Sequence, residues 1–274
     1  METTGRLLTK PFTFSQSSLQ DYLDCPRRFQ LKYIQQVQWP AVESVPYLEN
    51  ERRQIEGQIF HRMVQQYYLG LPPEKISPLA STDNLARWWN NFQSAVPRLP
   101  GYRIFTELGL SARIGGHRLT AKYDLVAVKE NEARIIFDWK TYMRRPARTR
   151  MAERMQTKVY TSLMFEAGSR AVSLAPSDWQ NVEMIYWYAE FPESPEKFSS
   201  NKSTLQQAWK QVEGLIREID ARQSFPLTED KRACDVCTFR SLCERGIIAG
   251  ETTELDSIDA SEFIDFEQIQ EIEF

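Results

Sequence analysis

The feature that most constrains the fold is a run of three strand-like segments near the middle of the chain. Residues 103–114, 118–128 and 133–139 are rich in β-branched and aromatic residues, and two typical turn sequences separate them. Segments of helical character lie on both sides of this run, and residues 182–189 form a further apolar segment of strand length. The order predicts a mixed α/β domain built around a strand meander.

Helices are predicted before and after the meander. They cover residues 17–24, 27–37, 51–69, 82–96, 151–167 and 203–222. Pro26 interrupts the first helical region because proline cannot continue the backbone hydrogen-bond ladder. Ser17 with Gln20, and Ser203 with Gln206, fit capping boxes at two of the helix starts.

The composition is that of a folded protein without a membrane span. The chain has 274 residues, of which 42% are hydrophobic and 26% charged, enough apolar material for a sizeable core. No run reaches the ~18 apolar residues that a spanning helix needs, and residues 1–10 lack the apolar segment of a secretory signal. We therefore expect a cytoplasmic protein whose four cysteines are reduced thiols rather than disulfides.

The net charge of −3 is unevenly distributed along the chain. Residues 251–274 hold nine acids and no bases, so the remaining 28 acids stand against 34 Lys and Arg, a net charge of +6 over residues 1–250. We interpret residues 1–250 as one folded domain and residues 251–274 as an acidic tail. A mildly basic domain suits a nucleic-acid partner, although a solvated tail on an ordinary enzyme explains the charge equally well.

Acidic residues inside the meander are the clearest sign of a functional site. Asp124 lies in an apolar strand, where a buried carboxylate is costly unless a partner satisfies it. Asp138 and Lys140 end the next strand and, two residues apart, share one face. Two carboxylates on neighbouring strands repel each other unless a cation lies between them, and their oxygens suit Mg²⁺ or Mn²⁺. A simple strand-end ion pair is the alternative interpretation of Asp138 and Lys140.

The spacing of the two acids makes this site testable. In an antiparallel hairpin, Asp124 and Asp138 share a face only if the connecting loop holds an odd number of residues. A loop over residues 129–131 or 129–133 satisfies this condition. A regular four-residue loop would place the two carboxylates on opposite faces.

Two of the predicted helices carry further candidates. His61 follows Gly57 on the helix at 51–69, and Gln156 and Tyr160 are four residues apart, so they share a helix face. His61 is either a metal ligand or a hydrogen-bonded packing residue, and Tyr160 is either a site residue or part of the core. His117, in the turn after two glycines, is expected at the surface.

The order of these residues resembles the PD-(D/E)XK nuclease superfamily, particularly its RecB-like branch. The residues that carry the resemblance are Gly57, His61, Asp124, Asp138, Lys140, Gln156 and Tyr160, together with Cys25-Pro26-Arg27-Arg28-Phe29 near the start. It extends over about residues 14–243, and it departs from the pattern in that no proline precedes Asp124. The resemblance implies a restriction-endonuclease-like core, in which a mixed central sheet is flanked by helices.

The resemblance also implies a metal site. Asp124 and Asp138 would bind Mg²⁺ or Mn²⁺ together with the backbone carbonyl of Trp139. His61 would be the third side-chain ligand, and its imidazole favours Mn²⁺ over Mg²⁺.

The remaining residues of the pattern have implied roles in catalysis. Lys140 would act on the attacking water, while Gln156 and Tyr160 would steady Lys140 and the DNA strand. The implied activity is hydrolysis of DNA phosphodiester bonds by an exonuclease acting on single strands or ends, in repair, recombination or CRISPR adaptation. The sequence has no Gly-x4-Gly-Lys-Ser/Thr loop, so unwinding would need a helicase partner.

A protein of another class is the alternative to a nuclease. A non-catalytic DNA-binding or scaffolding module could keep the same fold. Loss of Asp124, Asp138 or Lys140 would favour it, but the chain retains all three.

Three cysteines form a compact group near the end of the domain, and the fourth lies far upstream. Cys234, Cys237 and Cys243 are separated by two and five residues, and Cys25 precedes Cys234 by 209 positions. Four thiolates suit an iron–sulfur cluster or Zn²⁺. The resemblance implies a structural [4Fe–4S] cluster that joins the N-terminal and C-terminal segments. Zinc, or unligated thiols, are the alternatives.

Basic and aromatic residues next to Lys140 suggest a nucleic-acid surface. Arg144, Arg145 and Arg148 would meet a phosphate backbone approaching the site, although a solvated charge run is an equally good interpretation. Trp139 and Tyr142 are candidates for stacking on unpaired bases, or for packing.

Overall fold

The computed structural model describes residues 7–37, 45–129, 134–172, 181–235 and 237–246. The acidic tail predicted over residues 251–274 therefore lies outside the described residues. The strands are β1 (Thr13–Phe14), β2 (Arg103–Ile114), β3 (His117–Val128), β4 (Arg134–Lys140), β5 (Asn181–Tyr188) and β6 (Phe191–Asn201). The longer helices are α1 (Gln16–Asp24), α3 (Val45–Tyr68), α5 (Asp83–Ser94), α7 (Met155–Ala171) and α8 (Lys202–Ala221). The short helices are α2 (Pro26–Phe29), η1 (Gln30–Ile34), α4 (Pro73–Ile76), η2 (Ser77–Leu79), α6 (Arg148–Glu153), α9 (Arg232–Asp235) and η4 (Arg240–Cys243).

Within the described part of the chain, the strands form one mixed sheet of six. Its order is β1-β3-β4-β5-β6, and β2 also pairs with β3. The predicted meander of β2, β3 and β4 is antiparallel, whereas β4 and β5 are parallel and are connected through α6 and α7. This is the mixed α/β, restriction-endonuclease-like arrangement expected from the sequence.

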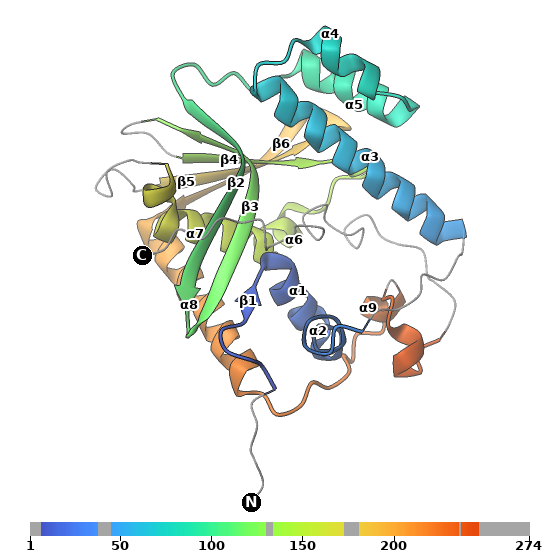
Figure 1. Cartoon of the computed structure of the whole chain (residues 1–274), viewed down its shortest axis with the longest axis vertical. Coiled ribbons are helices and arrows are strands. Elements are labelled where there is room, and N and C mark those ends of the chain that lie inside the picture. The colour runs from blue at the N-terminus through green and yellow to red at the C-terminus, as the bar shows by residue number, and fades with distance from the viewer. Residues whose placement is uncertain (1–6, 38–44, 130–133, 173–180, 236, 247–274) are drawn as a thin grey trace, which may run out of the picture.

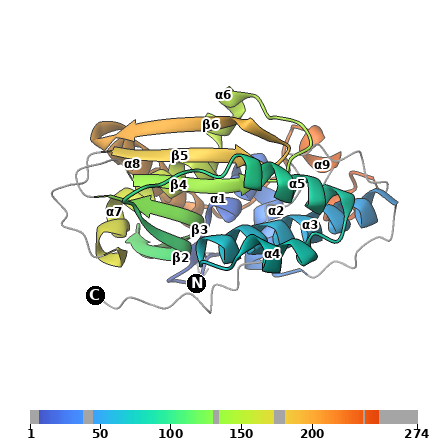
Figure 2. The ribbon, with the colours of Figure 1, turned by 90° about the horizontal axis from the view of Figure 1, so that it is seen from above.

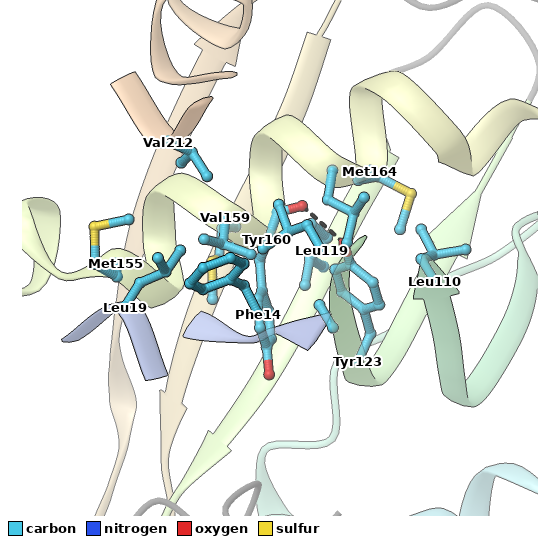
Figure 3. Packing of buried hydrophobic residues seen from close by; sticks show 14 of the residues in the cluster. Phe14, Leu19, Leu110, Leu119, Tyr123, Met155, Val159, Tyr160, Met164 and Val212 are labelled. Atoms are coloured by element: carbon cyan, nitrogen blue, oxygen red, sulfur yellow. Dashed lines mark hydrogen bonds between the residues drawn. The ribbon is translucent and has the colours of Figure 1, made fainter. Parts of the chain in front are cut away.

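Helices cover both faces of the sheet (Figures 1 and 2). On one face, α1, α7 and α8 pack on the strands around a large apolar core. Figure 3 shows part of this core, where Phe14 of β1 and Leu19 of α1 lie beside Val159 of α7. On the other face, α3 and α5 contribute a second core rich in aromatic rings, including Phe60, Trp88 and Trp139. The central strands are therefore buried on both sides.

The register of the β3–β4 hairpin confirms the prediction from spacing. Leu125 pairs with Phe137 and Ala127 pairs with Ile135. β3 ends at Val128 and β4 begins at Arg134, so the connection spans residues 129–133, one of the two odd-numbered loops expected. Asp124 and Asp138 come one step beyond the Leu125–Phe137 pair and lie on the same face.

The predicted helix at 151–167 is two helices, α6 and α7, which break at Arg154. The backbone of Arg154 is extended, with φ −61° and ψ 144°. Side chains compensate for the interrupted ladder: Thr157 Oγ1 donates to the Met151 carbonyl at 2.6 Å, and Met155 N–H donates to Gln20 Oε1 at 3.1 Å. The break therefore depends on contacts that span the chain.

Both capping boxes were predicted two residues late. Ser15 caps α1 and exchanges side-chain hydrogen bonds with Ser18, so the box is Ser15–Ser18. Asn201 caps α8, and its side chain accepts from Thr204 N–H at 3.0 Å. In both cases the polar side chain two residues before the predicted one caps the helix.

Two strands were missed in the sequence. β6 contains Pro192 and Pro195, which weaken a strand prediction but are tolerated because β6 lies at the edge of the sheet. β1 has only two residues and pairs in parallel with β3. The short length of β1 and the prolines of β6 explain why the sequence did not predict these strands.

His117 is buried, so its expected place at the surface is wrong. Its Nδ1 accepts from Phe12 N–H at 3.1 Å, and its Nε2 lies 3.3 Å from Asp220 Oδ1 on α8. Lys10 also reaches Asp220, at 2.9 Å. The N-terminal segment and α8 cover the β2–β3 turn, which the local sequence does not indicate.

Candidate active site

The candidate site lies where β3 and β4 separate. The last β3–β4 pair before the site is Leu125 with Phe137. Beyond it, Trp139 N–H donates to Asp124 Oδ2 at 2.9 Å, so a side-chain carboxylate accepts a backbone N–H of the neighbouring strand. β4 stays paired with β5 as far as Lys140. β3 therefore separates from β4 while β4 stays paired with β5, and this opening leaves room for polar side chains in an otherwise apolar sheet.

Asp138 lies at the centre of a cluster of buried polar side chains. Its Oδ1 accepts from Gln156 Nε2 at 2.7 Å, and its Oδ2 lies 2.9 Å from Lys140 Nζ. Asp138, Lys140 and Gln156 are 4%, 3% and 3% exposed. Charges buried this deeply are tolerated only when they are compensated, and here Lys140 supplies an ion pair and Gln156 a hydrogen bond to Asp138.

His61 approaches the site from α3. Its Nδ1 lies 3.2 Å from Asp124 Oδ1. Gly57, one helical turn earlier, allows α3 to come close to the end of β4, because a Cβ there would lie only 3.2 Å from Thr141 Oγ1. The predicted pair of Gly57 and His61 therefore has a physical basis, in which the glycine permits the approach and the histidine makes the contact.

The charges of His61 and Asp124 depend on each other. Burial lowers the pKa of His61, but the Asp124 carboxylate, with a contribution from Asp138, raises that pKa to about 9. Burial raises the pKa of Asp124, but the His61 charge and the Trp139 N–H lower it overall. With this raised pKa, the His61 imidazolium supplies positive charge beside the two carboxylates at neutral pH.

Tyr160 is part of the core. Its ring centre lies 4.8 Å from that of Tyr123, and its carbonyl accepts from the Tyr123 hydroxyl at 3.0 Å (Figure 3). The rings beside the Lys140 ammonium are those of Tyr142 and Tyr186, each 5.7 Å from Nζ. Sequence reasoning missed Tyr186, and the only available signal was its place on an apolar strand.

The aromatic residues expected to stack on bases are largely enclosed. Trp139 is buried among the rings of the second core, including Phe137 and Trp187, so stacking of its face on DNA is ruled out. Tyr142 is also buried, beside Tyr188.

The carboxylates and the imidazole at the site are ligand types that fit Mg²⁺ or Mn²⁺, but in this structure they contact other protein groups. Among the described residues, no three or more His, Cys, Asp or Glu side chains are arranged to hold an ion. The carboxylate oxygens of Asp124 face His61 and Trp139 N–H, and those of Asp138 face Gln156 and Lys140. A cation would take over contacts that the imidazolium makes here. Two carboxylates and an imidazole are ligands that suit Mn²⁺ and, less well, Mg²⁺.

The four cysteines come from the two ends of the domain into one neighbourhood. All four are free thiols. Burial raises the pKa of Cys237, and the charges of Cys25 and Cys243 raise it further. Burial also raises the pKa of Cys243, with added effects of Cys25 and Cys234. The donor type fits an iron–sulfur cluster or zinc, although the described thiols are not arranged around a common centre.

Two of the three arginines next to the site are already paired. Arg145 and Arg148 both bind Glu196 on β6, and Arg148 also donates to the Lys197 carbonyl at 2.6 Å. Arg144 is exposed. The basic segment is therefore partly neutralised by the edge strand, although all three arginines remain at the surface.

Comparison with known proteins places the chain in a family. The profile of the PD-(D/E)XK nuclease superfamily matches residues 13–244, so the chain belongs to this superfamily. A search of curated proteins finds no match. In the described residues, no helix is long and apolar enough to cross a membrane.

Two solved structures are similar to this chain over most of its length. One, from Eubacterium rectale, is described as a candidate exonuclease; it has a TM-score of 0.51 and 11% identity, with 88% of this chain and 91% of that chain covered. The crystal structure of SSO0001 has a TM-score of 0.42 and 14% identity, with 88% of this chain and 89% of that chain covered.

Proposed function

We propose that this protein is a metal-dependent DNA exonuclease of the RecB-like branch, acting on single strands or DNA ends. One observation carries the proposal. Asp124, Asp138 and Lys140 meet where β3 and β4 separate, and Gln156 and His61 reach the same point from helices on opposite faces of the sheet. Membership of a nuclease superfamily supports the same reading.

The residues of the site divide the chemistry between them. Asp124, Asp138 and His61 would hold the cation, which when bound stabilises the negative charge that develops on the scissile phosphate. Lys140 holds a water near the phosphorus and donates to the developing charge. The water oxygen bonds to phosphorus and gives up a proton to solvent, the bond to the leaving oxygen breaks, and the leaving oxygen takes up a proton from solvent. Gln156 fixes the orientation of Asp138.

The cysteines are proposed to bind a structural [4Fe–4S] cluster. Cys25, Cys234, Cys237 and Cys243 flank the catalytic motifs in the sequence and lie apart from them, so a catalytic role does not follow from their position. Packing of Leu31 against Cys237 and Phe239 brings the two ends of the domain together. The cluster would fasten this contact.

Cleavage of DNA by protein purified without oxygen tests the proposed function. Three DNA substrates are compared: end-labelled linear single strands, end-labelled linear duplexes and circular single strands. Each is incubated with Mn²⁺ or Mg²⁺ and with wild-type protein or Lys140→Ala. We expect metal-dependent shortening of linear DNA, little cleavage of circles, and a strongly reduced but measurable rate in the variant. DNA binding without cleavage by either metal would instead identify a non-catalytic binding module. Equal cleavage of circles would show an endonuclease.

A further inference from the structure

One carboxylate and two tyrosine rings enclose the Lys140 ammonium. Its Nζ lies 2.9 Å from Asp138 Oδ2 and 5.7 Å from the ring centres of both Tyr142 and Tyr186. A cation within ~6 Å of an aromatic face is attracted by the negative charge of that face. The rings therefore attract the ammonium from two further directions. Neither tyrosine is one of the motif residues on which the resemblance to the nuclease superfamily rests.

The Tyr186 ring is itself fixed through its hydroxyl. Thr157 Oγ1 lies 2.7 Å from Tyr186 Oη and donates its hydrogen to the Met151 carbonyl at 2.6 Å. Because threonine has a single hydroxyl hydrogen, Tyr186 is the donor to Thr157. Burial, and the nearby Asp138 charge, raise the pKa of Tyr186, which agrees with a neutral phenol that donates. The Phe198 ring packs against the Tyr186 ring in a T-shaped arrangement, with 5.9 Å between the ring centres.

We propose that Tyr142 and Tyr186 are positioning residues that hold the Lys140 ammonium against Asp138, and that Thr157 fixes the Tyr186 ring. The inference rests on the proposed nuclease function, in which Lys140 acts on the attacking water. A lysine side chain is long and flexible, so fixing it costs conformational entropy. The two rings pack beside the buried ammonium and restrict its rotamers before substrate binds. Small errors in the placement of a catalytic group lower rates strongly.

Paired substitutions separate this role from simple packing. Tyr186→Leu removes the aromatic face, and we expect kcat to fall ~10-fold with little change in KM. Tyr186→Phe keeps the face and loses only the hydroxyl, so its kcat should fall no more than ~3-fold. Tyr22→Leu is the matched control, because Tyr22 is a buried tyrosine on α1 that touches none of these groups. Its kcat per folded molecule should match the wild type.

A double-mutant cycle tests whether Tyr186 acts through Lys140. If it does, Tyr186→Leu causes no further loss of rate in the Lys140→Ala background. Equal fractional losses in the two backgrounds would overturn the proposal. A wild-type kcat for Tyr186→Leu would overturn it as well.

The position of Lys140 can also be measured without catalysis. In protein labelled with ¹³C at lysine Cε, the Lys140 signal is identified by its absence in Lys140→Ala. Ring currents should move its Hε resonance upfield, and Tyr186→Leu should reduce that shift while Tyr22→Leu retains it. An unshifted resonance in the wild type would overturn the proposal. If the wild type cuts no DNA, the proposed nuclease function fails, whereas this shift still reports whether the rings enclose Lys140.

Discussion

The proposed catalytic site and the proposed cysteine site differ in how the fold fixes the side chains that would bind a metal. The proposed catalytic residues come from β3, β4, α3 and α7, between two large apolar cores, and protein donors face both carboxylates. The cysteines lie mainly on α9, η4 and the connecting segment, beside a small apolar cluster of Leu31, Cys237 and Phe239. The comparison teaches that the packed sheet fixes its charged groups through protein partners, whereas the small cysteine segment has few apolar contacts, and we propose that a bound cluster stabilises it.

The largest expected effect is loss of the cluster. Cys237→Ala should abolish the brown colour and lower the Tm by about 10 °C, because metal binding supplies much of the folding free energy of a small ligated segment. Thermal unfolding followed by circular dichroism and absorbance measures both. Ser241→Ala, in the same segment, is the control and should keep colour and Tm. A colourless variant with the wild-type Tm would show that the cysteine segment does not need a bound cluster for its stability.

The same substitution in the two regions should differ in cost. Leu163 is fully buried in the core between α7 and the sheet, and Leu163→Ala should lower the free energy of unfolding by about 3 kcal/mol. Leu31→Ala, in the small cluster, should cost about 2 kcal/mol because fewer apolar neighbours lose contact. Urea unfolding measures both values. Equal costs would show that the cysteine segment is packed as well as the core.

Metal affinity sharpens the contrast at the catalytic site. Asp124→Asn removes a charge that faces His61, and we expect Mn²⁺ to bind about 100-fold more weakly, a loss of about 2.7 kcal/mol. Electron paramagnetic resonance of free Mn²⁺ measures this. Asp83→Asn, at the exposed start of α5, is the charge-matched control. Unchanged binding in Asp124→Asn would place the cation elsewhere.

A smaller effect is expected where α1, next to Cys25, is tied to the main body. The Tyr22 hydroxyl donates to Glu218 on α8 at 2.6 Å, so Tyr22→Phe should cost about 1 kcal/mol at pH 7.

The contact between Tyr22 and Glu218 also has a predicted pH dependence. Burial, followed by the Glu218 contact, raises the pKa of Tyr22 from 10.0 to about 12. The stabilisation is therefore complete below pH 10 and is lost as pH rises towards 12. The Phe variant should lack this loss in stability measured across that range. An identical pH profile would contradict the assignment.

The part of the site that depends on strand periodicity was predictable from the sequence. The facing of Asp138 and Lys140 follows from the two-residue period of a strand, and the same period gives the condition, an odd-numbered loop, under which Asp124 reaches that face. The helix face of Gln156 follows in the same way from its period. These features are local, so a short stretch of sequence determines them.

The remaining features depend on contacts between distant segments. Burial of His117 needs Phe12 and Asp220, and the break at Arg154 is supported by Gln20. The ring of Tyr186 meets Lys140 only because β5 lies parallel to β4. Nothing in the local sequence of these residues specifies such partners.

The most direct test of the account is the rate at which wild-type protein and Asp138→Asn cleave end-labelled single-stranded DNA over a titration of Mn²⁺. The account predicts a wild-type rate that saturates with Mn²⁺ and a variant rate lower by about 10³-fold, with DNA affinity retained. Equal rates in the two proteins, or cleavage that persists without metal, would contradict the assignment of the active site to the point where β3 and β4 separate.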